Sequence, residues 1–278
     1  MSLKSLQNQN HTGNKSKGNE KKLYNTSDNN LDAFAAPLVH DTVFNLCENI
    51  IKEHNKGKAL DVLILGAGSG YFDKRLMDYG IKNIDAIEYL PEHYKAKGTR
   101  LYSYDLNNTW ANKLLTQNNN RKYDLIIAIE VIEHLENSFM LMREIKSILG
   151  YNGQIIITSP NVESTFSRIR FLLTGYLEYF GITEMMGTGH ISPIFSHIFK
   201  LNLEINKIKL IHVYNNRNIW LARIGESTSY AKVKSGIKKI STIILSIITF
   251  VCLILKKKNI YKNKNEGEIN IYHLKNAN

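Results

Sequence analysis

The chain has 278 residues, 43% of them hydrophobic, and a formal net charge of +11. This length suits one large domain with or without tails, and this apolar content can fill a core. The two cysteines, Cys47 and Cys252, exclude a disulfide framework and a cysteine-based metal site, so we expect a reducing compartment. Residues 1–6 contain no apolar signal-peptide core, and residues 1–30, which are polar, are expected to be disordered.

The most informative stretch is an apolar run that leads into three glycines. Residues 60–65 predict a buried parallel strand, and Gly66, Gly68 and Gly70 follow it. Glycines without a Cβ let the backbone turn sharply and approach a ligand closely. Residues 71–79 predict a helix whose N-terminal N–H groups face this turn. The pattern therefore predicts a nucleotide-binding turn.

Two more predicted strands end in carboxylates. The strand over 83–89 brings Glu88 to a position 18 residues after Gly70, about the separation at which an acidic residue binds ribose hydroxyls. A third strand near 100–104 ends in Asp105. A dinucleotide-binding fingerprint would require its third glycine where Tyr71 stands, so a nicotinamide dehydrogenase is disfavoured.

The segment 123–161 contains the next motifs. An apolar strand leads into Glu130, Glu133 and His134, and a helix over 137–149, a turn over 150–153 and a strand over 154–159 should follow; Pro160 and Asn161 come after that strand. With the glycine spacing, this order of motifs resembles the Rossmann-like (class I) S-adenosylmethionine-dependent methyltransferases. In pattern it is most similar to those of the ubiquinone pathway and of bacterial glycan and lipid pathways. The resemblance is strong over 60–161.

The resemblance implies an α/β fold: a seven-stranded, mostly parallel sheet with helices on both faces and an antiparallel last strand. It also implies S-adenosylmethionine as cofactor, with Glu88 at the ribose and Asp105 at the adenine amine. The cofactor-binding residues that it implies are Gly66, Ala67, Gly68, Gly70, Glu88, Tyr89, Asp105, Leu106 and Glu130.

One position departs from the family pattern. Relatives usually carry an acidic residue two positions before the first glycine, where this chain has Ile64. Asp61 lies three positions earlier, so on an extended strand it faces the opposite side and should not substitute. We therefore expect weaker anchoring of the glycine turn or of the methionine amino group.

The catalytic candidates are histidines. Glu130, Glu133 and His134 have i, i+3, i+4 spacing, so one helical face could present all three, and His134 is the first candidate for a general base. The trio is also similar to the metal-binding pattern of ubiquinone-pathway and small-RNA 3′-end methyltransferases. The alternative is that Glu130 lines the cofactor pocket while Glu133 and His134 shape the cleft. A divalent metal is thus an option that we do not favour, and we assign no metal ligand.

Residues 162–200 should form a lid over the methyl acceptor. A helix over 166–174 is followed by a segment over 175–189 that is rich in glycine, aromatic residues and methionine. Such a segment suits an apolar or amphipathic acceptor. His190 follows it, either as a second base, as a contact for acceptor hydroxyls, or as a structural residue at a helix start.

Most of the positive charge lies outside the catalytic core. Nine lysines and no acidic residue occur over 232–264, around the apolar run 240–255. As a helix this run would be about 24 Å long, shorter than a hydrocarbon core of about 30 Å. Its polar residues share one side, which favours a helix lying in the interface of an anionic membrane. Packing on this protein or on a second subunit, and a true membrane span, are the alternatives.

The position of the last strand determines whether the lysine-flanked segment is an insertion in the domain or a C-terminal extension. Residues 267–275 resemble the last strand of the family sheet and should pair antiparallel with a strand near 207–214. A rival assignment places the last strand at 219–224. The first assignment gives a methyltransferase domain over 31–230, an inserted lysine-flanked helix over 231–264 and the last strand over 265–278.

These observations predict a methyltransferase that acts at oxygen on a lipid-associated, quinone-like or glycan small molecule. One alternative is an RNA 2′-O-methyltransferase, which would need a basic groove around the cleft. Another is a non-catalytic adaptor with this fold, docked at a membrane, for which Ile64 is the best support. We expect a cytoplasmic protein, with peripheral attachment to the inner membrane face as an option, no nucleic-acid partner and an undetermined oligomeric state.

Overall fold

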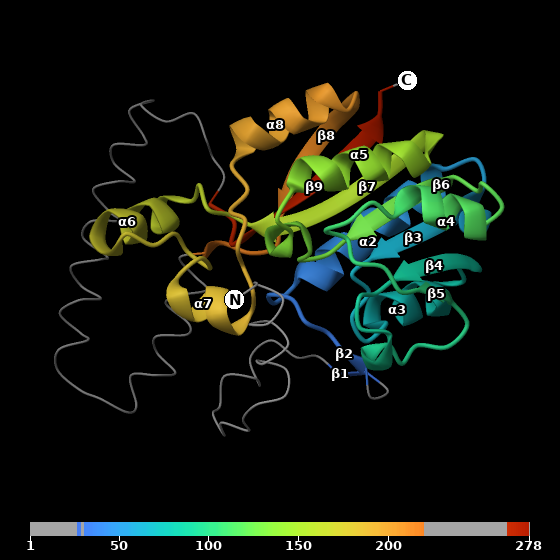
Figure 1. Cartoon of the computed structure of the whole chain (residues 1–278), viewed down its shortest axis with the longest axis horizontal. Helices are drawn as coiled ribbons and strands as arrows, with labels where there is room; N and C mark the ends of the chain where they lie inside the picture. Colours follow the sequence, from blue (N-terminus) through green and yellow to red (C-terminus); the bar gives the residue numbers. More distant parts are fainter. Residues whose placement is uncertain (1–26, 29–30, 220–265, 278) are drawn as a thin grey trace.

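A seven-stranded sheet lies at the centre of the computed structural model, which describes residues 27–28, 31–219 and 266–277 (Figure 1). The strand order is β5-β4-β3-β6-β7-β9-β8, and β9 runs antiparallel to both of its neighbours while the other pairings are parallel. The predicted fold class is therefore confirmed. The strands of this sheet are β3 (Asp61–Leu65), β4 (Asn83–Ile87), β5 (Arg100–Tyr102), β6 (Tyr123–Ala128), β7 (Leu149–Pro160), β8 (Ile208–Asn215) and β9 (Ile269–Asn276).

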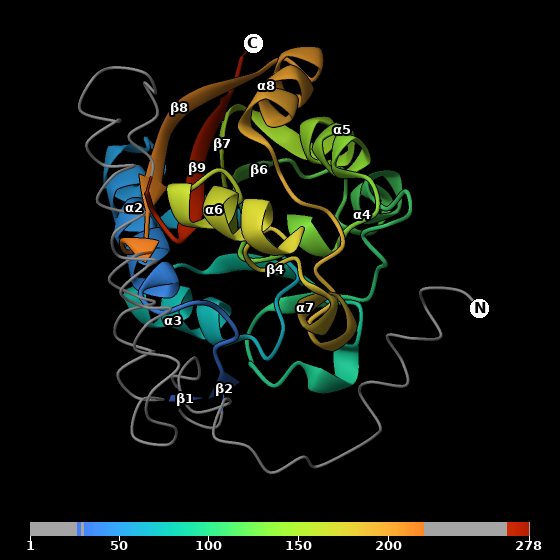
Figure 2. The same cartoon turned by 90° about the vertical axis from the view of Figure 1, so that its left-hand side faces the viewer.

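Helices cover both faces of the sheet (Figure 2). Successive residues of a strand point to opposite faces, so Leu63 and Leu65 of β3 pack with α4, α5 and α8, while Val62 and Ile64 pack with α2 and α3. The α-helices of the described residues are α2 (Val39–Glu53), α3 (Tyr71–Tyr79), α4 (Ala111–Gln117), α5 (Ser138–Ile148), α6 (Thr165–Thr174), α7 (Ile182–Gly187) and α8 (Ser196–Ile205). Three single-turn 3₁₀ helices, η2 (Gly57–Ala59), η3 (Pro91–His93) and η4 (Ile132–His134), and a short antiparallel pair, β1 (Ser27–Asp28) and β2 (Leu31–Asp32), complete the elements.

Local sequence signals set the bounds of α3, which are those predicted. Gly70 and Gly80 flank the helix, and both adopt the left-handed conformation that glycine tolerates best. Phe72 and Leu76 form its buried face. Since β3 ends at Leu65, the glycine turn joins a buried strand to a helix N-terminus, as expected.

The last-strand prediction is confirmed, and the residues of the predicted turn, 150–153, lie inside the bounds of β7 as an irregularity of that strand. β9 pairs with β8 from Ile208 to Asn215, close to the expected partner strand. Leu149 pairs with Tyr123 of β6 and Gln154 pairs with Leu125, so residues 150–153 have no partner in β6 and the register shifts there. Gly150 permits the close approach of β7 to β6 at this register shift, because a Cβ at that position would lie only 3.0 Å from the carbonyl oxygen of Tyr123.

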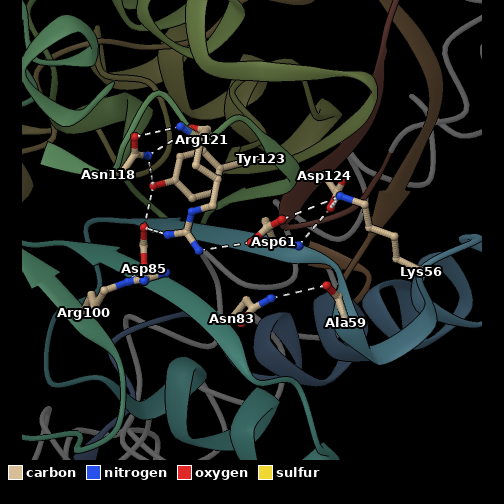
Figure 3. Close-up of polar contacts among 10 residues, drawn as sticks. All are labelled: Lys56, Ala59, Asp61, Asn83, Asp85, Arg100, Asn118, Arg121, Tyr123 and Asp124. Atoms are coloured by element: carbon tan, nitrogen blue, oxygen red, sulfur yellow. Dashed lines mark hydrogen bonds and ion pairs between the residues drawn. The ribbon is translucent and has the colours of Figure 1, made fainter. Parts of the chain in front are cut away.

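A buried ion-pair network lies near the amino ends of the central strands (Figure 3). Asp85 of β4 is fully buried and accepts hydrogen bonds from Arg121, from the Arg100 Nε at 2.7 Å and from the Tyr123 hydroxyl at 2.6 Å. Arg121 also donates to Asp61 of β3 at 3.0 Å. The network therefore joins β3, β4, β5 and the start of β6 at the edge opposite to the glycine turn.

Two segments singled out by the sequence lie outside the described residues. The tail over 1–30 is described only at residues 27–28, and the lysine-flanked segment over 231–264 is not described. Among the helices of the described ranges, none is both long enough and apolar enough to cross a membrane.

Candidate cofactor and acceptor site

The glycine turn between β3 and α3 has a conformation that depends on glycine. Gly66 and Gly70 have φ angles of 63° and 86°, in the left-handed region. A Cβ on Gly66 would lie 2.6 Å from a methyl carbon of Val131. A Cβ on Gly70 would lie 2.4 Å from the Ala96 Cβ. At Gly66 and Gly70 the turn therefore has no room for a side chain, whereas a Cβ on Gly68 would meet no atom within 4 Å.

Glu88 at the end of β4 anchors this turn. One carboxylate oxygen accepts the Gly68 N–H at 2.7 Å, and the other accepts the Leu90 N–H at 3.1 Å. Ile64 is buried in the core, so the chain has no carboxylate at the position that relatives use. Asp61 pairs with Arg121 at the far end of β3 and does not substitute, as expected. Glu88 therefore anchors the glycine turn, although the sequence departs from the family pattern at Ile64.

A cavity of about 240 Å³ opens at the carboxyl ends of β3, β4 and β6. Predicted cofactor residues line it, as does the predicted base His134, whereas Ala67, Gly68, Gly70 and His190 are not among its lining residues. The predicted residues in the lining are Gly66, Glu88, Tyr89, Asp105, Leu106, Glu130 and His134. The sequence analysis missed the lining residues Tyr104, Asn107, Val131, Leu135, Glu136 and Ile191. Most of these residues are adjacent in the chain to predicted ones, and that adjacency could have identified them.

Asp105 is held in place before any ligand binds. Its carboxylate accepts the Asn107 N–H at 2.9 Å and the Asn108 side-chain amide at 2.9 Å. Each carboxylate oxygen has more than one lone-pair site, so these bonds leave capacity for a further donor. The geometry is compatible with the predicted contact to an adenine amine.

Glu130, Glu133 and His134 do not share one α-helical face, so that expectation is wrong. Glu130, two residues after the end of β6, has a φ of 53°, and only a 3₁₀ turn, η4, follows. The Glu130 N–H donates to the Thr158 hydroxyl at 2.8 Å, and that hydroxyl donates back to the Glu130 carboxylate at 2.6 Å. Burial raises the pKa of Glu130 to about 7, with a further rise from nearby Glu268 and an opposing effect of the Thr158 hydrogen bond.

Glu133 turns into the protein interior. Its side chain is fully buried, and neither carboxylate oxygen has a hydrogen-bond partner. Burial, together with the charge of Glu130, raises the pKa of Glu133 well above its usual value, which favours the neutral acid. Its backbone carbonyl accepts the N–H groups of Ile191 and Ser192 at 3.0 and 2.9 Å, which fixes the segment after His190 to the site.

The structure brings His134 and His190 together. Their ring centroids lie 4.8 Å apart at 75°, an edge-to-face arrangement. The Nδ1 of His134 lies 3.2 Å from the Gly189 carbonyl oxygen, and the Nδ1 of His190 lies 3.0 Å from the Tyr179 carbonyl oxygen. A carbonyl oxygen only accepts, so in both neutral rings Nδ1 carries the proton and Nε2 the lone pair. His190 lies in a segment without regular secondary structure between α7 and α8, not at the expected helix start.

Both rings are held in the neutral form. Burial lowers the pKa of His134 to about 4, helped by the neighbouring His190 and opposed by backbone carbonyls of Gly189 and Thr188. Burial also lowers the pKa of His190, against the raising effects of the Tyr179 carbonyl and of Glu184. Each ring can therefore accept a proton at neutral pH, although His134 is a weak base.

The same cluster is the candidate metal centre. Ligand atoms of Glu133, His134 and His190 lie within 4.8 Å of one another, so His190 takes the place that the sequence analysis gave to Glu130. The donor types suit a divalent ion that would polarise an acceptor hydroxyl. However, the burial of Glu133 favours a protonated carboxyl group, which is a poor ligand. The protonation of Glu133, and not the geometry of the three side chains, therefore argues against a metal.

Comparison with known families agrees with the motifs and the fold. The family described as "Methyltransferase domain" matches residues 38–198. This match covers more than half of the chain, so the chain belongs to that family. The predicted class, the S-adenosylmethionine-dependent methyltransferases, is confirmed.

Individual relatives are distant. A ubiquinone biosynthesis O-methyltransferase of Rickettsia typhi is 27% identical over 123 residues, 44% of this chain and 50% of that protein. The chain thus spans about half the length of the curated relatives it matches. A SAM-dependent methyltransferase of Anabaena variabilis has a TM-score of 0.50 at 10% identity, covering 87% of this chain and 86% of its own. The plantazolicin methyltransferase BamL, solved with SAH and a triazolic desmethylPZN analog, has a TM-score of 0.50 at 13% identity, with the same coverage. These structures support the fold.

Proposed function

We propose that the protein transfers a methyl group from S-adenosylmethionine to a hydroxyl oxygen of a lipid-associated, quinone-like or glycan small molecule. The observation that carries this proposal is one cavity lined both by Glu88, which is tied to the glycine turn, and by the neutral imidazole of His134. The names of the curated relatives, ubiquinone biosynthesis O-methyltransferases, support oxygen as the acceptor atom.

The residues of the cavity have separable roles in this proposal. Glu88 binds the ribose hydroxyls, Asp105 binds the adenine amine, and Glu130 and His134 line the same cavity. The transfer is an in-line displacement in which the acceptor oxygen attacks the methyl carbon and the carbon–sulfur bond breaks. Alignment of donor and acceptor can contribute about 7–11 kcal/mol to such a reaction. The fixed glycine turn and the segment around His190 would provide that alignment.

His134 is proposed to accept the hydroxyl proton through Nε2. His134→Asn should lower the rate of transfer about 100-fold, the low end of general-base effects, because a pKa of about 4 makes the imidazole a weak base. The wild-type rate should not depend on His134 protonation between about pH 6 and 8 and should fall as the pH approaches 4, where the ring becomes charged.

The measurement uses radiolabelled S-adenosylmethionine with lipid, glycan and RNA extracts as acceptor sources. His212→Asn, at an exposed histidine on β8, is the matched control and should transfer at the wild-type rate. Transfer by His134→Asn at the wild-type rate would remove His134 from the reaction. Label in the lipid or glycan fraction supports the proposed acceptor class, and label in RNA alone contradicts it.

The charges of the cavity favour an uncharged acceptor over RNA. Four carboxylate residues line the cavity, and its lining includes no lysine or arginine. RNA binding requires cationic side chains along the backbone. Exposed Ile182, Met185 and Met186 on α7 of the lid offer apolar contacts instead. The four carboxylate residues are Glu88, Asp105, Glu130 and Glu136.

The non-catalytic adaptor is the second candidate, because Ile64 replaces the usual carboxylate. The Glu88 contacts to Gly68 and Leu90 support cofactor binding without that group. Calorimetric binding of S-adenosylmethionine would favour the enzyme, and absence of binding would favour the adaptor. Attachment to a membrane through residues 231–264 stays a sequence-based prediction, since that segment lies outside the described residues.

Removal of divalent metals should leave transfer unchanged within about 2-fold, because a protonated Glu133 does not complete a metal site. The test compares rates before and after dialysis against EDTA, together with the metal content of the purified protein. A loss of activity that Mg²⁺ restores would assign Glu133, His134 and His190 to a metal.

A further inference from the structure

We propose that Tyr179 and Glu268 are positioning residues that hold the His190 ring against His134. The role assigned to His190 rests on the proposed function, whereas the contacts that hold the ring do not. Neither positioning residue lines the cavity, and they come from distant parts of the chain, the lid and the start of the last strand.

Glu268 is a buried carboxylate directly before β9. Its side chain is fully buried, and Arg217 at the end of β8 donates to both of its oxygens, through Nε and, at 3.1 Å, through Nη2. Asn216 donates to it at 3.2 Å. Burial would raise the pKa of Glu268, but the hydrogen bonds from Arg217 and Tyr179 and the charge of Arg217 outweigh it and lower the pKa. Glu268 is therefore ionised and a strong acceptor.

Tyr179 connects this carboxylate to the lid. Its hydroxyl donates to Glu268, and its backbone carbonyl accepts the His190 Nδ1–H at 3.0 Å. Its φ of 66° lies in the left-handed region, which is costly for a tyrosine and persists only where the surroundings fix the residue. The bond to Glu268 fixes the side chain, and the strained backbone then presents the carbonyl to His190.

The carbonyl of Tyr179 sets the state of the His190 ring. Because it accepts from Nδ1–H, it selects the tautomer whose lone pair is on Nε2 and fixes the ring plane. The ring is then confined by Phe180, with centroids 5.6 Å apart, and by His134, with centroids 4.8 Å apart. A continuous set of contacts thus runs from Arg217 through Glu268 and Tyr179 to the two histidines.

This arrangement differs from apolar core packing because burying an ionised carboxylate has a large desolvation free energy. An ionised carboxylate placed in the interior needs several hydrogen bonds to offset its lost hydration. Here those bonds end on a strained tyrosine whose carbonyl orients a histidine of the site. An apolar core would hold the lid without any of these groups, so the structure assigns them to the orientation of His190.

Tyr179→Phe tests the proposal because it removes only the hydroxyl that binds Glu268. We expect the His190 ring to sample both tautomers in this variant, and kcat to fall about 10-fold, the effect of one lost hydrogen bond, with an unchanged KM for S-adenosylmethionine. Nitrogen-15 NMR of the imidazoles reports the tautomer, and the His190 signals are identified by their loss in His190→Gln. Tyr151→Phe, at an exposed tyrosine, is the matched control and should match wild type.

Glu268→Gln is the second variant, since it keeps a side-chain oxygen that can accept the tyrosine hydroxyl while removing the charge. Glu268→Gln should change the populations of the two His190 tautomers less than Tyr179→Phe does. An unchanged His190 spectrum and an unchanged kcat in Tyr179→Phe would overturn the proposal, as would an equal effect in Tyr151→Phe. If the wild-type protein transfers no methyl group to any extract, the proposed function fails, and the NMR comparison still decides whether Tyr179 positions His190.

Discussion

Replacing Glu88 by alanine is expected to weaken S-adenosylmethionine binding by about 100-fold or more, corresponding to the loss of two hydrogen bonds to a charged group at about 1.5 kcal/mol each. Two effects combine in this variant. The carboxylate that would accept the ribose hydroxyls is lost, and the Gly68 and Leu90 N–H groups lose their acceptor. The glycine turn then has no carboxylate anchor, because Ile64 offers none.

Isothermal calorimetry with S-adenosylmethionine measures this effect directly. Glu92→Ala, on the exposed η3 turn four residues later, is the matched control and should bind like wild type. Glu88→Gln keeps one hydrogen-bond acceptor and adds an amide donor. Its affinity for S-adenosylmethionine should lie between those of the wild type and of Glu88→Ala. Unchanged affinity in Glu88→Ala would remove Glu88 from the ribose role.

Asp85→Ala is expected to lower the free energy of unfolding by about 2–3 kcal/mol, the scale of hydrogen bonds lost from a buried charge. The cost stays below that of an unpaired buried charge, because Arg121 keeps Asp61 and the Arg100 side chain is 58% exposed. The change leaves Arg121, Arg100 and the Tyr123 hydroxyl without their shared acceptor (Figure 3). A typical domain has only about 5–15 kcal/mol of stability, so this one change would remove a large part of it.

Urea denaturation followed by circular dichroism measures that loss. Asp78→Ala, which breaks the exposed i,i+4 pair with Lys74, is the control and should cost about 0.5 kcal/mol or less. The folded Asp85→Ala variant should still bind S-adenosylmethionine, because the network lies at the amino ends of the strands. A stability equal to that of wild type would show that the network contributes nothing net.

Much of the glycine turn and of the cavity lining followed from local sequence. A strand that ends in glycines and continues into a helix is encoded within some twenty residues, and α3 has the bounds that were predicted. Glu88 and Asp105 could be placed because the carboxyl ends of neighbouring parallel strands meet at one edge of the sheet. The predicted turn over 150–153 coincides with the irregular part of β7, where four residues lie between the pairings of Leu149 and Gln154 with β6.

The sequence by itself determined the fold class, the family and the glycine turn, because these depend on short periodic patterns and on residues adjacent in the chain. Tertiary structure alone decided that His190, not Glu130, joins Glu133 and His134, since a left-handed Glu130 and a single 3₁₀ turn replace the expected helical face. It also decided that Glu268 meets Tyr179, 89 positions away. Contacts at such separations arise from the packing of residues 162–200 on the last strand, and no local pattern encodes them.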